Sequence, residues 1–149
     1  MLLGSCSLFL LWMIPDVDVG PSLTTNSNSD SMASAEERVA FVSRYIKPKA
    51  PIVDASFRIV YQDNGQGLPG PSDWSESIAL RVHPADSQQW LAGANLETPG
   101  NAKEPLSRQF RRVIPDSWGV SSSGDIYYLN GAWLIWHSEG ALEHLSTTF

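Results

Sequence analysis

Apolar residues recur at helical spacing in one stretch that begins near residue 34. The apolar positions of this stretch are Ala35, Val39, Val42 and Ile46. Steps of three and four residues place such positions on one face of an α-helix. Ser34 and Glu37 have the spacing of a capping box, and Pro48 stops the run. The pattern predicts an amphipathic helix that starts near Ser34 and lays its apolar face on a sheet.

Two stretches alternate between apolar and polar positions, as half-buried strands do. In residues 52–61 the alternating apolar positions are Val53, Ala55, Phe57, Ile59 and Tyr61. In residues 77–83 they are Ile78, Leu80 and Val82. A period of two over this length predicts one strand in each stretch. Between residues 84 and 93, a proline at the start and a glycine at the end predict a short helix.

The clearest short-range signal is a hairpin near the C-terminus. Residues 125–129 and 132–137 are two apolar runs, and Asn130-Gly131 joins them. An Asn-Gly pair between such runs is typical of a two-residue type I′ turn. That turn sets the register, so Tyr128 is expected to face Trp133 and Ile126 to face Ile135.

Together these elements predict an α+β fold. The expected architecture is an N-terminal helix packed on a mostly antiparallel sheet of about four strands, with short inserted helices. The order of the strands within the sheet does not follow from the pattern.

The N-terminal region has a different composition. Leu2–Ile14 carries no charged residue and is rich in Leu, Phe, Trp and Met. About thirteen apolar residues are fewer than the roughly twenty that span a bilayer, and they suit the core of a signal peptide. We expect residues 1–19 to be a hydrophobic leader or anchor. Residues 20–33, which are mostly Ser, Thr, Asn and Asp, are expected to be a flexible tether, and residues 34–149 a single α+β domain.

Cys6 is the only cysteine of the chain. This excludes an internal disulfide and a cysteine-based zinc site. Leu3-Gly4-Ser5-Cys6 resembles the lipobox of bacterial lipoproteins, for a chain whose start lies upstream of Met1. The resemblance covers these four residues and implies that Cys6 is lipidated. No Lys or Arg precedes Arg38, so the alternative is a short uncleaved anchor.

Charge and motifs exclude two classes of ligand. The net charge is −6 and the pI about 4.9, which argues against a nucleic-acid partner. Gly65, Gly67 and Gly70 form a G-x-G-x-x-G pattern after a predicted strand. A dinucleotide loop must open a helix whose N–H groups hold the pyrophosphate, but Pro69 and Pro71 lack that group. We interpret the segment as a hairpin loop and expect no cofactor.

The most specific surface feature is a group of three arginines. Within residues 105–114, Leu106, Phe110 and Val113 fall on one face of a predicted helix. The opposite face carries Arg108, Arg111 and Arg112. Guanidinium groups bind carboxylates and phosphates through paired donors. The cluster therefore predicts an acidic protein partner or an anionic ligand, and its alternative is a solvated face without a ligand.

Tryptophans are numerous in the predicted domain. They are Trp74, Trp90, Trp118, Trp133 and Trp136. Exposed indoles stack on sugars or anchor a protein partner, whereas buried ones are core. We take Trp74, Trp118 and Trp136 as candidate contact residues beside the arginines.

The histidines give the enzyme alternative. His83 and His137 each end a predicted strand, and a hydrolase would use one of them with an acidic partner such as Asp125. His137, Glu139, Glu143 and His144 lie close in sequence. Their spacing is not H-E-x-x-H, so we predict no metal site.

These observations favour binding over catalysis. We expect a small domain, exported or attached to the bacterial cell envelope, that contacts the membrane only through its N-terminal segment. Its size suits a lipoprotein-like inhibitor or immunity protein of the periplasm. The alternatives are the small hydrolase and a Trp-based glycan-binding module.

Overall fold

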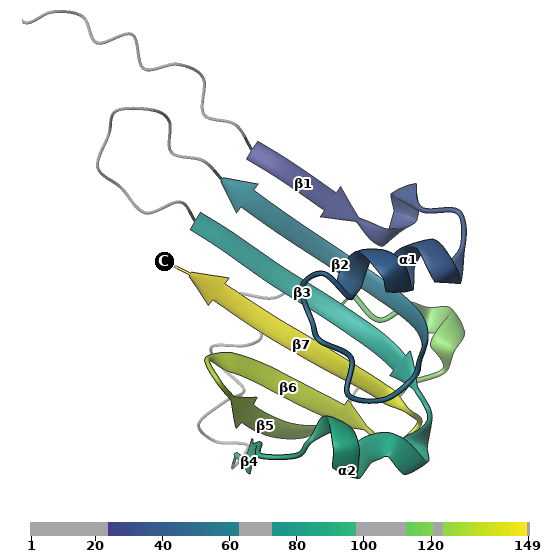
Figure 1. The fold of residues 1–149 in the computed structure, drawn as a ribbon, viewed down its shortest axis with the longest axis vertical. Helices are drawn as coiled ribbons and strands as arrows, with labels where there is room; N and C mark the ends of the chain where they lie inside the picture. Colours follow the sequence, from purple (N-terminus) through teal and green to yellow (C-terminus); the bar gives the residue numbers. More distant parts are fainter. Residues whose placement is uncertain (1–23, 63–72, 98–112, 121–123, 149) are drawn as a thin grey trace, which may run out of the picture.

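The computed structural model describes residues 24–62, 73–97, 113–120 and 124–148. Its centre is an antiparallel sheet (Figure 1) whose described strands are ordered β1-β2-β3-β7-β6-β5-β4. The strands are β1 (Thr24–Asn28), β2 (Ile52–Gln62), β3 (Asp73–Val82), β4 (Asn95–Leu96), β5 (Asp125–Leu129), β6 (Ala132–His137) and β7 (Ala141–Thr148). The helical elements are η1 (Ser29–Ser31), α1 (Ala35–Val42), η2 (Pro84–Asp86), α2 (Ser87–Trp90) and η3 (Asp116–Trp118). The α+β class and the antiparallel sheet are confirmed.

The predicted number of about four strands is wrong, because the described sheet has seven. The additional strands are β1, β4 and β7. β1 is polar on both faces, β4 has only two residues, and Glu143 and His144 interrupt the apolar pattern of β7. β1 forms part of the segment that composition predicted as a tether, and it pairs along its length with the end of β2. An edge strand is held by backbone hydrogen bonds and needs no apolar side chains, so hydropathy does not reveal it. Since β1 precedes α1, the helix is not the first element of the described fold.

α1 begins where the capping signal predicts. The Ser34 hydroxyl accepts a hydrogen bond from the Glu37 backbone N–H at 3.2 Å. The pKa of the Glu36 carboxyl is lowered, first by its own backbone N–H and then by the Ser34 hydroxyl. The helix packs on β2, where the Phe41 ring stacks on Phe57 with centroids 4.8 Å apart. We call this side of the sheet the helix face.

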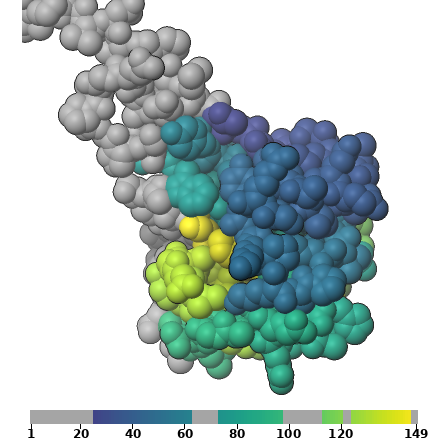
Figure 2. Space-filling model, viewed as in Figure 1, coloured from purple at the N-terminus to yellow at the C-terminus, as the bar shows by residue number. Residues whose placement is uncertain are grey.

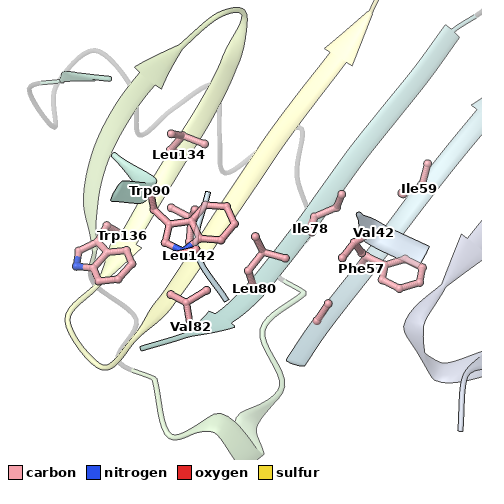
Figure 3. Packing of buried hydrophobic residues seen from close by; sticks show 12 residues of the cluster. Val42, Phe57, Ile59, Ile78, Leu80, Val82, Trp90, Leu134, Trp136 and Leu142 are labelled. Atoms are coloured by element: carbon pink, nitrogen blue, oxygen red, sulfur yellow. The ribbon is translucent and has the colours of Figure 1, made fainter. Parts of the chain in front are cut away.

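The main core lies on the helix face (Figure 3). Its central members are Phe57, Ile78, Leu80, Val82 and Leu142 from β2, β3 and β7, with Val42 of α1 and Trp90 of α2 above them. Trp136 and Leu134 extend it towards β6. Burying large apolar side chains of this kind is the dominant favourable contribution to folding.

The opposite face of the sheet is covered in part by residues 113–120. Ala79 and Ala141 are fully buried there, and their small side chains let Ile114 pack closely. Val113, Trp118 and Val120 complete this contact. Val113 and Ile114 are not helical, and the rest of the helix predicted over 105–114 lies outside the described residues.

The remaining predicted elements are close to those observed. The hairpin register is confirmed, with Tyr128 opposite Trp133 and Ile126 opposite Ile135. Asn130 and Gly131 both have positive φ, as a type I′ turn requires. The predicted helix over 84–93 forms as η2 and α2, and the Lys49 ammonium donates to the carbonyls of Trp90 and Ala92 at its C-terminal end. Within the described ranges, no helix combines the length and apolar character needed to cross a membrane.

Candidate functional site

The structure separates the residues that the sequence singled out. Arg108, Arg111, Arg112 and Cys6 lie outside the described residues. Trp136 lies in the core and is 9% exposed, so it has no free ring face to offer a partner. Trp74 is half-buried at the start of β3 and has an interaction of its own. Trp118 is half-buried in η3 and lines a pocket.

The last two strands form a hairpin that sends neighbouring histidines and glutamates to opposite faces. On the opposite face, His137 Nε2 lies 2.9 Å from Glu143 Oε1. On the helix face, His144 Nδ1 lies 3.0 Å from Glu76 Oε1 of β3. Successive side chains of a strand point to opposite faces, so Glu143 and His144 cannot act together. Among the described residues, no three metal-ligating side chains gather at one place.

The Glu76–His144 pair is the less well satisfied of the two. Glu76 Oε1 and His144 Nδ1 are both buried and lack a hydrogen-bond partner, although they lie 3.0 Å apart. The Glu76 side chain is 2% exposed and that of His144 is 21% exposed. In Figure 2, yellow atoms of β7 reach the surface beside the β5–β6 hairpin. The two atoms lie within ion-pair distance but are not aligned for a hydrogen bond, and the described residues around them include no nucleophile bonded to either side chain.

The hydrolase pairing predicted for Asp125 is not formed. Asp125 lies opposite Trp136 and is exposed, whereas His137 is buried on the other face with Glu143 as its partner. His83 is exposed and caps η2, since its Nδ1 accepts a hydrogen bond from the Ala85 N–H at 3.2 Å. Neither histidine is therefore paired with Asp125, and the acidic partner of His137 is Glu143.

A pocket of about 240 Å³ lies where β1 ends and β2 begins. η1, α1, the first part of β2 and the segment around η3 meet there. In Figure 1, η3 lies behind the sheet at this end. The polar and aromatic side chains of its lining include Asp30, Arg38, Asp54, Ser56, Ser117 and Trp118. These residues are distant in sequence, and only the fold brings them together.

An ion pair fixes one wall of the pocket. Both Nε and Nη2 of Arg38 contact Asp54 Oδ1, at 2.9 and 2.8 Å. Nη1 of Arg38 donates to the Met32 carbonyl at 3.3 Å. The two side chains are 21% and 20% exposed, so solvent screens the pair only in part. Arg38 therefore ties α1 to both the chain before it and the start of β2.

A short hydrogen-bond chain fixes the second wall. The Ser56 hydroxyl donates to the Val113 carbonyl at 2.6 Å and lies 3.2 Å from the Ser29 hydroxyl. This chain joins η1, β2 and the segment that carries Trp118. The pocket is therefore preformed by bonds within the protein.

Sequence reasoning found one member of the pocket and missed the others. Trp118 was singled out by its residue type. Asp30 lies in the segment that composition predicts as a tether, and Arg38 and Asp54 belong to no recognisable motif. The capping signal places Arg38 in the first turns of a helix, but only the pairing of β1 with β2 brings Asp30 into the same pocket.

Comparisons with protein-family models, with curated proteins and with solved structures give no match for this chain.

Proposed function

We propose that this protein works by binding and that the pocket between η1, α1, β2 and η3 is its contact site. The observation that carries the proposal is the pocket itself, whose lining contains Trp118 and two groups of side chains held by hydrogen bonds within the protein. Concave sites with a few fixed polar groups and an aromatic side chain are where ligands are held. Its volume of about 240 Å³ is below the roughly 300–1,000 Å³ of pockets for drug-sized ligands. It suits a side chain or another compact group.

A capture experiment with a matched pair of variants tests this function. The full-length protein is immobilised, and an extract of the producing cell is passed over it. Ser117→Tyr fills the pocket from an exposed position, and Ser138→Tyr makes the same change in the exposed β6–β7 turn. We expect a partner that is retained by the unchanged protein and by Ser138→Tyr, and lost with Ser117→Tyr. Equal retention by the two variants would refute the pocket as the contact site.

The arginine cluster gives a second contact surface in this proposal. Arg108, Arg111 and Arg112 lie outside the described residues, so the proposal rests on their spacing in the sequence. An acidic protein partner would bind there through charge-assisted hydrogen bonds. The two surfaces need not meet the same region of a partner.

The proposed localisation is the bacterial cell envelope, where the protein would be a lipoprotein that resembles an inhibitor or immunity protein. Its support is the apolar composition of Leu2–Ile14 and the lipobox-like position of Cys6. The mass of the mature N-terminal peptide tests this directly. A diacylglyceryl addition on Cys6 supports the proposal, and an unmodified peptide that contains Met1 opposes it.

A further inference from the structure

Arg38 and Ser56 in the lining of the pocket direct donors to groups within the protein. Arg38 directs Nε and Nη2 to Asp54 and Nη1 to the Met32 carbonyl. The Ser56 hydroxyl gives its proton to the Val113 carbonyl. A hydroxyl has one proton to donate, so Ser56 offers none to a ligand. The cation of this lining, Arg38, is thus already paired with Asp54, so an anion would find no unpaired positive charge among the residues that line the pocket.

Acceptors, in contrast, remain. Nε and Nη2 of Arg38 and the Ala55 backbone N–H all bind Oδ1 of Asp54, and none of these bonds uses Oδ2. Asp30 is exposed and has no hydrogen bond or ion pair within the described part of the chain. An ionised carboxylate accepts through two oxygens and donates nothing. The pocket therefore keeps carboxylate oxygens that are free to accept hydrogen bonds from a ligand.

The charge of the lining points the same way. Asp30 and Asp54 are formally negative and Arg38 is positive, which leaves one uncompensated negative charge. The whole chain carries −6, which favours the approach of a cation to the protein as a whole. Trp118 adds an aromatic ring to the lining, and cations bind favourably over indole faces.

We propose that the pocket holds a basic side chain, arginine or lysine, presented by a protein partner. This inference rests on the proposed binding function and names the chemistry of its ligand. The cationic group would lie between the Asp30 carboxylate and the Trp118 ring, and its donors would use the acceptors that the fold leaves open. A pocket of this size takes one such side chain rather than a folded segment.

The test uses amino acids whose only charge is on the side chain. Nα-acetyl-arginine amide, Nα-acetyl-lysine amide and Nα-acetyl-glutamate amide are titrated into the isotope-labelled full-length protein and followed by NMR. Two variants are compared: Asp30→Asn removes the free carboxylate, and Asp116→Asn removes an exposed carboxylate close in sequence to Trp118 that does not line the pocket. Both changes replace an exposed side chain by one of the same shape, so the fold is retained.

We expect the two basic probes to shift the Trp118 indole signal with dissociation constants on the order of 1 mM. Asp30→Asn should raise the dissociation constants of the two basic probes about threefold or more. Asp116→Asn should leave these constants close to those of the unchanged protein. The glutamate probe should not bind. Equal effects of the two variants, stronger binding of the glutamate probe, or no shift up to about ten times the expected constant would overturn the cationic ligand.

Competition links the probe to a protein partner. Nα-acetyl-arginine amide should release the partner whose capture is lost with Ser117→Tyr, because the probe and the partner's side chain occupy the same pocket. If the partner is captured through the pocket but no basic probe binds or competes, the binding function stands and the basic side chain is refuted. If no pocket-dependent partner is captured, the proposed function itself fails.

Discussion

His137 Nε2 of β6 and Glu143 Oε1 of β7 lie 2.9 Å apart, and their side chains are only 2% and 8% exposed. We predict that His137→Leu destabilises the fold by about 3–5 kcal/mol, because it leaves a buried carboxylate without its partner. Glu143→Leu should cost less, about 1–3 kcal/mol, because it removes one hydrogen-bond partner of the buried imidazole and leaves no carboxylate behind. Urea unfolding of each variant measures both values.

The double variant provides the control for this pair. When both residues are leucine, neither polar side chain of the pair is left without the other. The free energy of unfolding should therefore fall by less than the sum of the decreases in the two single variants. Strictly additive losses would show that the two side chains do not stabilise each other.

Gly140 occupies a position that only glycine tolerates. Its φ is +90°, and a Cβ there would lie 2.5 Å from the Val82 carbonyl oxygen and 3.0 Å from Pro84 Cδ. Gly119 also has positive φ, at +66°, but a Cβ there meets nothing within 4 Å. We predict that Gly119→Ala costs about 1–2 kcal/mol from backbone strain alone. Gly140→Ala should cost about 1–3 kcal/mol more, because the backbone of β3 cannot move aside.

Thermal unfolding of the two glycine variants side by side tests the difference. The comparison isolates the steric contact, since both substitutions place alanine at positive φ. Similar melting temperatures for the two would show that the β6–β7 turn relaxes away from Val82.

The sequence predicted elements whose side chains carry the structural information. Phe57, Ile78 and Leu80 recur with a period of two because they lie on the face of their strands that packs in the main core, and Asn130-Gly131 is required by the turn between β5 and β6. β1 could not be predicted in this way, since its Thr, Asn and Ser side chains have no apolar face and only backbone pairing with β2 holds it. β7 was missed because Glu143 and His144 interrupt its apolar pattern, and their partners lie on β6 and β3.

The pocket could not be predicted from the sequence for a related reason. Asp30, Arg38 and Trp118 have no fixed spacing, and they meet because β1 pairs with β2 and residues 113–120 pack on Ala79. Long-range pairing of this kind leaves no periodic signal within any one segment. Residue type alone identified Trp118, and it placed the core residue Trp136 in the same group.

The arginine cluster gives a prediction about binding that needs no assumption about the pocket. Arg111→Glu combined with Arg112→Glu should weaken capture of an acidic partner, mainly through a slower association rate. The loss should shrink at high salt, because screening removes long-range attraction. Surface plasmon resonance at two salt concentrations measures both effects. A melting temperature that falls by more than a few degrees would instead indicate that these arginines are paired within the fold.

The edge strand β1 makes the N-terminal boundary of the folded unit testable. The sequence placed that boundary at residue 34, whereas β1 pairs with β2 from Thr24 to Asn28. Met32 packs against the core, and the Ser29 hydroxyl lies 3.2 Å from that of Ser56. A chain that starts at Ser34 loses these contacts and exposes the edge of β2, which is a template for intermolecular pairing.

We therefore predict that a chain starting at Gly20 unfolds cooperatively, at a temperature close to that of the full chain. A chain starting at Ser34 should melt at least about 5 °C lower, because the loss of one edge strand and its packing amounts to more than about 1 kcal/mol. It should also associate at high concentration, which size-exclusion chromatography detects. Thr25→Pro and Ser27→Pro in the longer chain separate the two causes, since proline removes a backbone donor without shortening the chain. If one of these prolines reproduces the lower melting temperature, the ladder between β1 and β2 is responsible. If the shorter chain melts with the longer one and remains monomeric, β1 adds nothing to the fold and the boundary at residue 34 is correct.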